Sequence, residues 1–113
     1  MTWETAVSST LAEVQAEGKL DELKSYLRID GDYDDATVFL SVRAAYQYIL
    51  DAVGEVDEDS MTAIMLLYAI TQCFYEEREL MQMDIQQRKR QMFMFQSIIL
   101  QLQQAKQIKD DGE

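Results

Sequence analysis

The sequence predicts an all-α protein, a small bundle of four or five helices, and three observations lead to that prediction. Apolar residues recur at spacings of three and four along most of the chain, which places them on one face of an α-helix. No segment alternates apolar and polar residues between turn-forming residues, as a half-buried strand would. Proline is absent and there are four glycines, so few positions interrupt a helix.

Five segments carry the helical pattern, and glycines mark where three of them end. In chain order they are Trp3, Val7, Leu11 and Val14, ending near Gly18; Leu20, Leu23 and Leu27, ending before Gly31; Phe39, Val42, Tyr46, Ile49 and Val53, ending at Gly54; the run Met61–Tyr75; and Phe95, Ile98, Ile99 and Leu102, within Met92–Gln107. The run Met61–Tyr75 is apolar almost all round, so we expect a helix buried on several sides. Asp34-Asp35 and Asp59-Ser60 precede the third and fourth segments, where such side chains accept hydrogen bonds from free backbone N–H groups.

Length and composition limit the kind of protein. With 113 residues, 48% of them apolar, the chain can bury one hydrophobic core, and we expect a single domain over residues 1–113. Met1 is not followed by the basic and apolar stretches of a secretory signal. The longest apolar run, eight residues from Ala63 to Ile70, is far shorter than the roughly 20 residues that cross a bilayer. We therefore expect a soluble protein made in the cytoplasm.

Charge is distributed unevenly along the chain. Up to Ser60 there are four Lys and Arg against fourteen Asp and Glu, a net charge of −10; from Met61 onward there are six against seven, a net charge of −1. The only basic cluster is Arg88-Lys89-Arg90, which is too little to expect specific DNA binding or binding to an anionic membrane. An acidic half of this kind suits a protein that repels nucleic acid or meets a basic partner.

Two acidic clusters lack the residues of known metal sites. Asp30–Asp35 starts like a calcium-binding EF-hand loop, but the glycine expected at its sixth position is Asp35 and the glutamate expected at its twelfth is Ser41. The second cluster has no histidine to complete a four-helix carboxylate site; it consists of Glu76, Glu77, Glu79 and Asp84. We expect a helix-capping turn at the first cluster, a solvated helix face at the second, and no cofactor.

Residues of the common catalytic arrangements are missing from the sequence. The chain has no histidine, no glycine-rich phosphate loop and one cysteine, Cys73, so neither a Cys–His pair nor a histidine base can form. Cys73 lies in the apolar run beside Phe74 and is better explained as a core residue than as a nucleophile. We therefore do not expect an enzyme.

Several segments resemble the head–tail connector family of tailed bacteriophages in their order and spacing. Leu20–Asp30, with the sequence LDELKSYLRID, is followed by Asp34-Asp35 and by Ala44-Ala45-x-x-Tyr48-Ile49. In the family, a similar helix precedes a paired-acid turn and a long helix. The family's next helix closes with a tyrosine, a spacer and an arginine, here Tyr75 and Arg78, and its terminal helix is similar to the stripe from Phe95 to Leu102.

Two positions depart from the family pattern. Glu77 stands where the family usually has asparagine, and no proline marks a loop before the last helix. The segment Met81–Arg90 consists instead of strong helix formers, so both a loop and a continued helix remain open there.

The resemblance implies a structural role in the virion. Such proteins form rings, commonly of about twelve copies, beneath the portal protein at the head–tail junction. The ring extends the portal's DNA channel, through which DNA passes without specific binding, and it offers a docking surface for the next connector, stopper or tail protein. The resemblance covers a core of residues 20–103, with residues 1–18 as an N-terminal helical extension and residues 104–113 as a flexible tail.

The residues that carry the resemblance are expected to specify the fold rather than to bind a ligand. They are Leu23, Lys24, Tyr26, Leu27, Arg28, Asp30, Asp34, Asp35, Tyr75 and Arg78. Leu23, Tyr26 and Leu27 should bury one helix face. Arg28, near the end of that helix, is placed to complement the helix dipole and to pair with Asp32, Asp34 or Asp35.

Two segments are candidates for contacts with other proteins. Arg88-Lys89-Arg90 is expected to pair with acidic residues of an adjacent subunit, or else to lie on a solvated helix face; Met92 and Phe93 are expected either to contact a neighbour or to join the core. The C-terminal segment is expected to dock on the portal, or else to be a disordered solubilising tail. Its candidate contact residues are Gln103, Lys106, Ile108 and Lys109.

A second function is compatible with the composition. An acidic helical protein can bind a basic partner, for example as a DNA-mimicking inhibitor of a DNA-processing enzyme. A mimic is expected to be a monomer or dimer, whereas a connector is expected to form a ring and to bind a portal.

Overall fold

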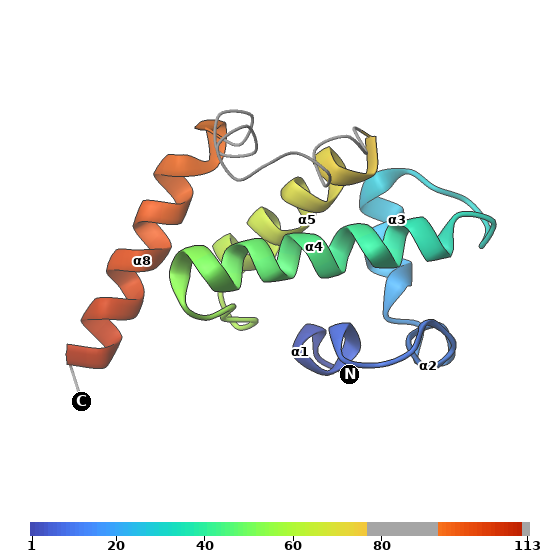
Figure 1. Ribbon diagram of the computed structural model, residues 1–113, viewed down its shortest axis with the longest axis horizontal. Helices are drawn as coiled ribbons and strands as arrows, with labels where there is room; N and C mark the ends of the chain where they lie inside the picture. The colour runs from blue at the N-terminus through green and yellow to red at the C-terminus, as the bar shows by residue number, and fades with distance from the viewer. Residues whose placement is uncertain (77–92, 112–113) are drawn as a thin grey trace.

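The computed structural model describes residues 1–76 and 93–111, which are helical apart from short connections (Figure 1). These residues form six α-helices, one 3-10 helix and no strand, so the predicted all-α class is confirmed. The elements are α1 Trp3–Val7, α2 Leu11–Ala16, α3 Leu20–Leu27, α4 Asp35–Val53, α5 Met61–Glu76, η1 Phe93–Phe95 and α8 Gln96–Asp111. Several predictions fall on residues outside the described ranges: those for the segment Met81–Arg90 and for Arg78, Arg88, Lys89, Arg90 and Met92.

Helix α4 is the centre of the fold. It lies alongside α5, and α8 crosses near its C-terminal end, while α1 and α2 lie on the side opposite the start of α8 (Figure 1). Its predicted apolar stripe is confirmed, because Phe39, Val42, Tyr46 and Ile49 are all buried. The facing side of α5 contributes Leu67, Ile70 and Phe74, which are fully buried.

Helix α5 is less enclosed than its composition predicts. Met61 is 75% exposed and Met65 is 49% exposed, although both belong to the run expected to be buried on several sides. One face of α5 packs on α4, and α3 and α8 each cover a smaller part of it. The prediction of burial on several sides is therefore wrong for the first turns of this helix, which present apolar side chains to solvent.

The first predicted stripe forms two short helices instead of one. The hydroxyl of Ser9 donates to the carbonyl of Thr5 (2.8 Å) at the end of α1. Thr10 then starts α2 with a capping box: its hydroxyl accepts from the N–H of Glu13 (3.2 Å), and the carboxylate of Glu13 accepts from the N–H of Thr10 (3.3 Å). Three hydroxyl residues in a row thus favour a break, because their side chains compete for backbone hydrogen bonds.

Replacement of Thr10 with alanine is expected to lower the free energy of unfolding by about 1 kcal/mol, because it removes one half of the capping box. Urea denaturation followed by circular dichroism measures this change. Thr62, exposed in α5, supplies the matched control: Thr62→Ala should leave stability unchanged. Equal effects of the two substitutions would contradict the importance of the cap.

The remaining helix ends agree in part with the sequence. Gly54 ends α4 in a left-handed conformation (φ 95°), where its N–H donates to the carbonyl of Leu50 (2.8 Å). Ser60 caps α5 as expected, since its hydroxyl accepts from the N–H of Ala63 (3.2 Å). Asp34 occupies the N-cap position of α4 without forming a side-chain cap, so its predicted capping role is wrong. No helix in the described part of the chain is both long and apolar enough to span a membrane.

Candidate functional site

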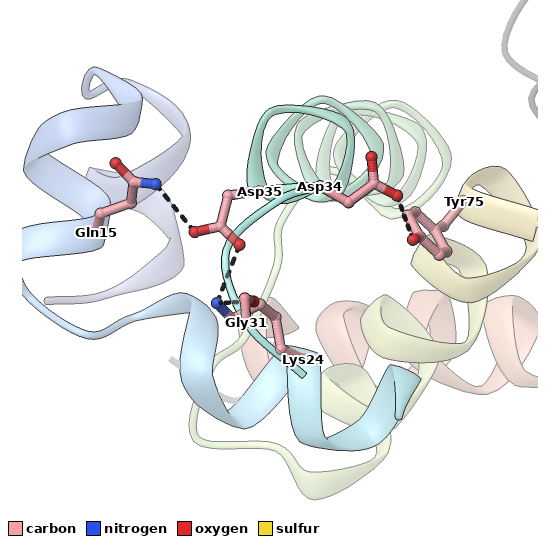
Figure 2. A network of polar contacts seen from close by, with 6 residues as sticks. All are labelled: Gln15, Lys24, Gly31, Asp34, Asp35 and Tyr75. Atoms are coloured by element: carbon pink, nitrogen blue, oxygen red, sulfur yellow. Dashed lines mark hydrogen bonds and ion pairs between the residues drawn. The ribbon is translucent and has the colours of Figure 1, made fainter. Parts of the chain in front are cut away.

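A network of polar contacts joins four helices at the turn before α4 (Figure 2). Asp35 lies at its centre and accepts hydrogen bonds from the side-chain amide of Gln15 in α2 (2.9 Å) and from the ammonium of Lys24 in α3 (3.0 Å). The same ammonium donates to the backbone carbonyl of Gly31 (2.9 Å). The Asp35 side chain is 5% exposed and that of Lys24 is 15% exposed, so this ion pair is largely withdrawn from water. We call these residues, with Asp34 and Tyr75, the turn network.

Asp34 and Asp35 are adjacent, but their carboxylates point in different directions (Figure 2). Asp34 accepts a hydrogen bond from the hydroxyl of Tyr75, near the end of α5. The paired acids therefore connect the start of α4 to α2 and α3 through one carboxylate, and to α5 through the other. This arrangement explains why the Asp34 carboxylate does not cap its own helix.

The carboxylates of the turn network are engaged by contacts between helices. Both carboxylate oxygens of Asp35 have partners, and the Lys24 ammonium contacts one of them together with the carbonyl oxygen of Gly31. Buried carboxylates with complete hydrogen bonding and a paired cation are typical of structural sites. In residues 1–76 and 93–111, no group of three acidic, histidine or cysteine residues is arranged to hold a metal.

The resemblance residues in the described part of the chain differ in their environments. Leu23 is fully buried, Leu27 packs against the core, and the ring of Tyr26 lies 5.7 Å from that of Tyr68. Arg28 and Asp30 are exposed. Arg28 was expected to pair with an acidic residue of the turn, and for Asp35 this is wrong. Asp35 forms its ion pair with Lys24, which lies one helical turn before Arg28. Arg28 itself adopts the left-handed conformation that ends α3 (φ 61°).

Two contacts of the N-terminal segment escaped prediction. Gln15 completes the hydrogen bonding of Asp35, and the carboxylate of Glu58 accepts from the backbone N–H groups of Trp3 (2.6 Å) and Glu4 (3.2 Å). Glu58 thereby caps α1 from a loop more than fifty residues away. The acidic run after Gly54 was the only feature of the sequence that could have indicated the Glu58 contact. It does not show from which N–H groups these carboxylates accept hydrogen bonds.

The C-terminal segment was expected to be a flexible tail from residue 104, whereas the structure continues α8 to Asp111. Gln103 donates to the carbonyl of Ala52 (2.7 Å), and Lys109 pairs with Glu55 (2.9 Å). Hydrogen bonding to Glu55 raises the pKa of Lys109. The side chain of Lys106 lies so near Gly54 that an added Cβ would be 3.3 Å from it. These contacts tie α8 to the end of α4 and to the loop that follows it, while Ile108 remains 72% exposed.

The Met- and Phe-rich run before α8 divides between the core and the surface. Phe95 is 9% exposed and packs in the core, whereas Phe93 is 75% exposed. Burial in the core is therefore confirmed for Phe95, and contact of Phe93 with a neighbour stays a prediction. Phe93 and Ile108 are the candidate contact residues whose apolar side chains face solvent.

Comparison with known families shows a match over most of the chain. Residues 17–105 match the family model described as phage gp6-like head-tail connector protein. The matched region contains α3, α4, α5 and most of α8, and it excludes α1 and α2. Neither the curated proteins nor the solved structures contain a match to the chain.

Proposed function

Because the chain belongs to the phage gp6-like head–tail connector family, we propose that it forms a homo-oligomeric ring beneath the portal of a phage or prophage. The ring extends the portal's DNA channel and offers the docking surface for the next connector, stopper or tail component. The family match over residues 17–105 carries this proposal. Assembly takes place in the host cytoplasm, and the mature protein resides at the head–tail junction of the virion.

Exposed apolar side chains on different helices support association through more than one surface. Leu40 on α4 is 54% exposed, Met61 on α5 is 75% exposed, and Phe93 in η1 is 75% exposed. A ring built from a single kind of subunit needs two different surfaces that meet head to tail. The acidic character of the chain also suits a channel through which DNA moves without being held.

The proposal is tested by measuring assembly of the purified chain. Light scattering over a series of concentrations, with negative-stain images of the same samples, is expected to show rings at high concentration or after addition of the cognate portal protein. Concentration matters because mass action governs association. A protein that stays a monomer or dimer under all these conditions and binds a basic DNA-processing enzyme would instead be an acidic regulator.

We also propose that the end of α8 contacts the portal through Gln103, Lys106, Ile108 and Lys109. Truncation after Leu102 is expected to abolish portal binding and also to lower the melting temperature, because it removes the contacts of Gln103 with Ala52 and of Lys109 with Glu55. Binding is measured by co-sedimentation with portal rings, and folding by circular dichroism. Ile108→Ser keeps the helix and removes one exposed apolar group, so it should weaken binding without any change in melting. Full portal binding by both variants would disprove this contact.

A further inference from the structure

A shallow groove of about 300 Å³ lies between α1, α3 and the start of α5. Its apolar lining comes from Ile64, Tyr68 and Met61, the last of which is 75% exposed. Its rim carries the carboxylates of Glu22, Glu58 and Asp59 and one cation, Lys19. We call this feature the acidic groove.

The carboxylates of the rim outnumber its one cation among the described residues. The Lys19 ammonium lies over the ring of Trp3, 4.8 Å from its centre, and the Glu58 carboxylate caps α1. Glu22 and Asp59 are exposed and form no ion pair with the other described residues. Burial, together with the nearby carboxylates of Glu22 and Glu58, raises the pKa of Tyr68 in the groove floor. The groove therefore combines an apolar floor with two carboxylates that form no ion pair among the described residues.

We propose that the acidic groove binds a second copy of this chain, through Phe93 and the basic sequence Arg88-Lys89-Arg90 that precedes it. Phe93 is 75% exposed, and the chain's only basic cluster lies within five residues of it. An exposed aromatic residue that follows three cations closely in the sequence complements an apolar floor with an acidic rim. This inference rests on the proposed ring and names the two surfaces that would meet in it.

The positions of the two surfaces suit a ring. The acidic groove includes α1, and Phe93 directly precedes α8; α1 and the start of α8 lie on opposite sides of α4 (Figure 1). A contact between them joins different faces of successive subunits, which is the heterologous geometry from which closed rings form. A basic segment of a portal protein is the other candidate occupant of the acidic groove. Measuring ring assembly and portal binding separately distinguishes it from a second copy of the chain.

The experiment reverses charge on each surface and then on both. One variant reverses the charge of the groove, Glu22→Lys/Asp59→Lys, and the other reverses the basic cluster, Arg88→Glu/Lys89→Glu/Arg90→Glu. Each alone is expected to raise the concentration for half-maximal ring assembly about tenfold or more, since like charges then face each other. The two sets combined should restore assembly toward that of the unaltered protein. Phe93→Ser and Met61→Ser should weaken assembly at both low and high salt, because they remove apolar contacts.

Controls and contrary outcomes separate this inference from the proposed function. Glu17→Lys/Asp30→Lys changes the same number of exposed charges outside the groove and should assemble normally, with circular dichroism confirming the fold of every variant. Normal rings from both reversed variants would overturn the inference and leave the ring itself intact. Rings that form normally but no longer bind portal after the Glu22/Asp59 change would assign the groove to the portal and also overturn it. Absence of rings from the unaltered protein would overturn the proposed function, and this inference with it.

Discussion

Replacement of Trp3 with alanine is expected to lower the free energy of unfolding by about 3 kcal/mol, the cost typical of removing a large buried aromatic side chain. Trp3 is 1% exposed although it is the third residue of the chain. Its ring meets that of Tyr68 edge to face, with 6.1 Å between centroids, and Lys19 lies over it. Urea denaturation would measure this loss of free energy, followed by circular dichroism of the helices, a signal that does not require the tryptophan.

Phe93 provides the control for this prediction. It is also aromatic but 75% exposed, so Phe93→Ala should change stability by no more than about 0.5 kcal/mol. Trp3→Phe retains part of the contact with Tyr68 and should lie between the unaltered protein and Trp3→Ala. A loss of less than about 1 kcal/mol in Trp3→Ala would show that residues 1–16 form an appendage and not a part of the core.

The expected importance of Trp3 bears on the boundaries drawn from sequence. The family match starts at residue 17, and the resemblance had placed residues 1–18 outside the core. Trp3, Ala6 and Val14 are nevertheless buried in the same cluster as the residues of α4 and α5. We propose that the N-terminal extension is part of one structural unit with the connector core.

The helices that sequence predicted well are those whose signals are local. The stripe from Phe39 to Ile49 repeats at helical spacing and ends at Gly54, a residue that readily adopts the left-handed conformation required there. The short helix Leu20–Leu27 was predicted for the same reason. In each case the side chains that decide the structure lie within one or two turns of one another.

The features that sequence missed depend on partners far apart in the chain. Asp35 lies within reach of both Lys24 and Arg28 in sequence, and only the path of the turn decides that Lys24 is its partner. Glu58 caps α1 across 55 residues. Exposure of Met61 depends on how much of α5 the short helices cover, which periodicity cannot specify. Candidate contact residues are the least predictable, because their partners belong to other molecules.

The turn network provides the second prediction of a large effect. Lys24→Met removes the cation from Asp35, whose side chain is 5% exposed, and leaves a buried carboxylate with Gln15 as its remaining side-chain donor. The free energy of unfolding should fall by about 3 kcal/mol, because an unpaired charge is costly where water is excluded. Asp35→Asn likewise leaves the ammonium of Lys24 without its carboxylate partner and should lower the free energy of unfolding by about 2 kcal/mol.

The double variant Lys24→Met/Asp35→Asn tests whether these losses arise from the pair. Because neither charge is then left alone, the double variant should lose about 3 kcal/mol in place of the roughly 5 kcal/mol that independent effects would give. Urea denaturation of all four proteins completes the cycle. Lys106→Met serves as the control, since it breaks the more exposed Lys106–Asp110 pair and should not move the denaturation midpoint measurably. Additive losses would mean that Asp35 and Lys24 stabilise the turn separately, Asp35 through Gln15 and Lys24 through the carbonyl of Gly31.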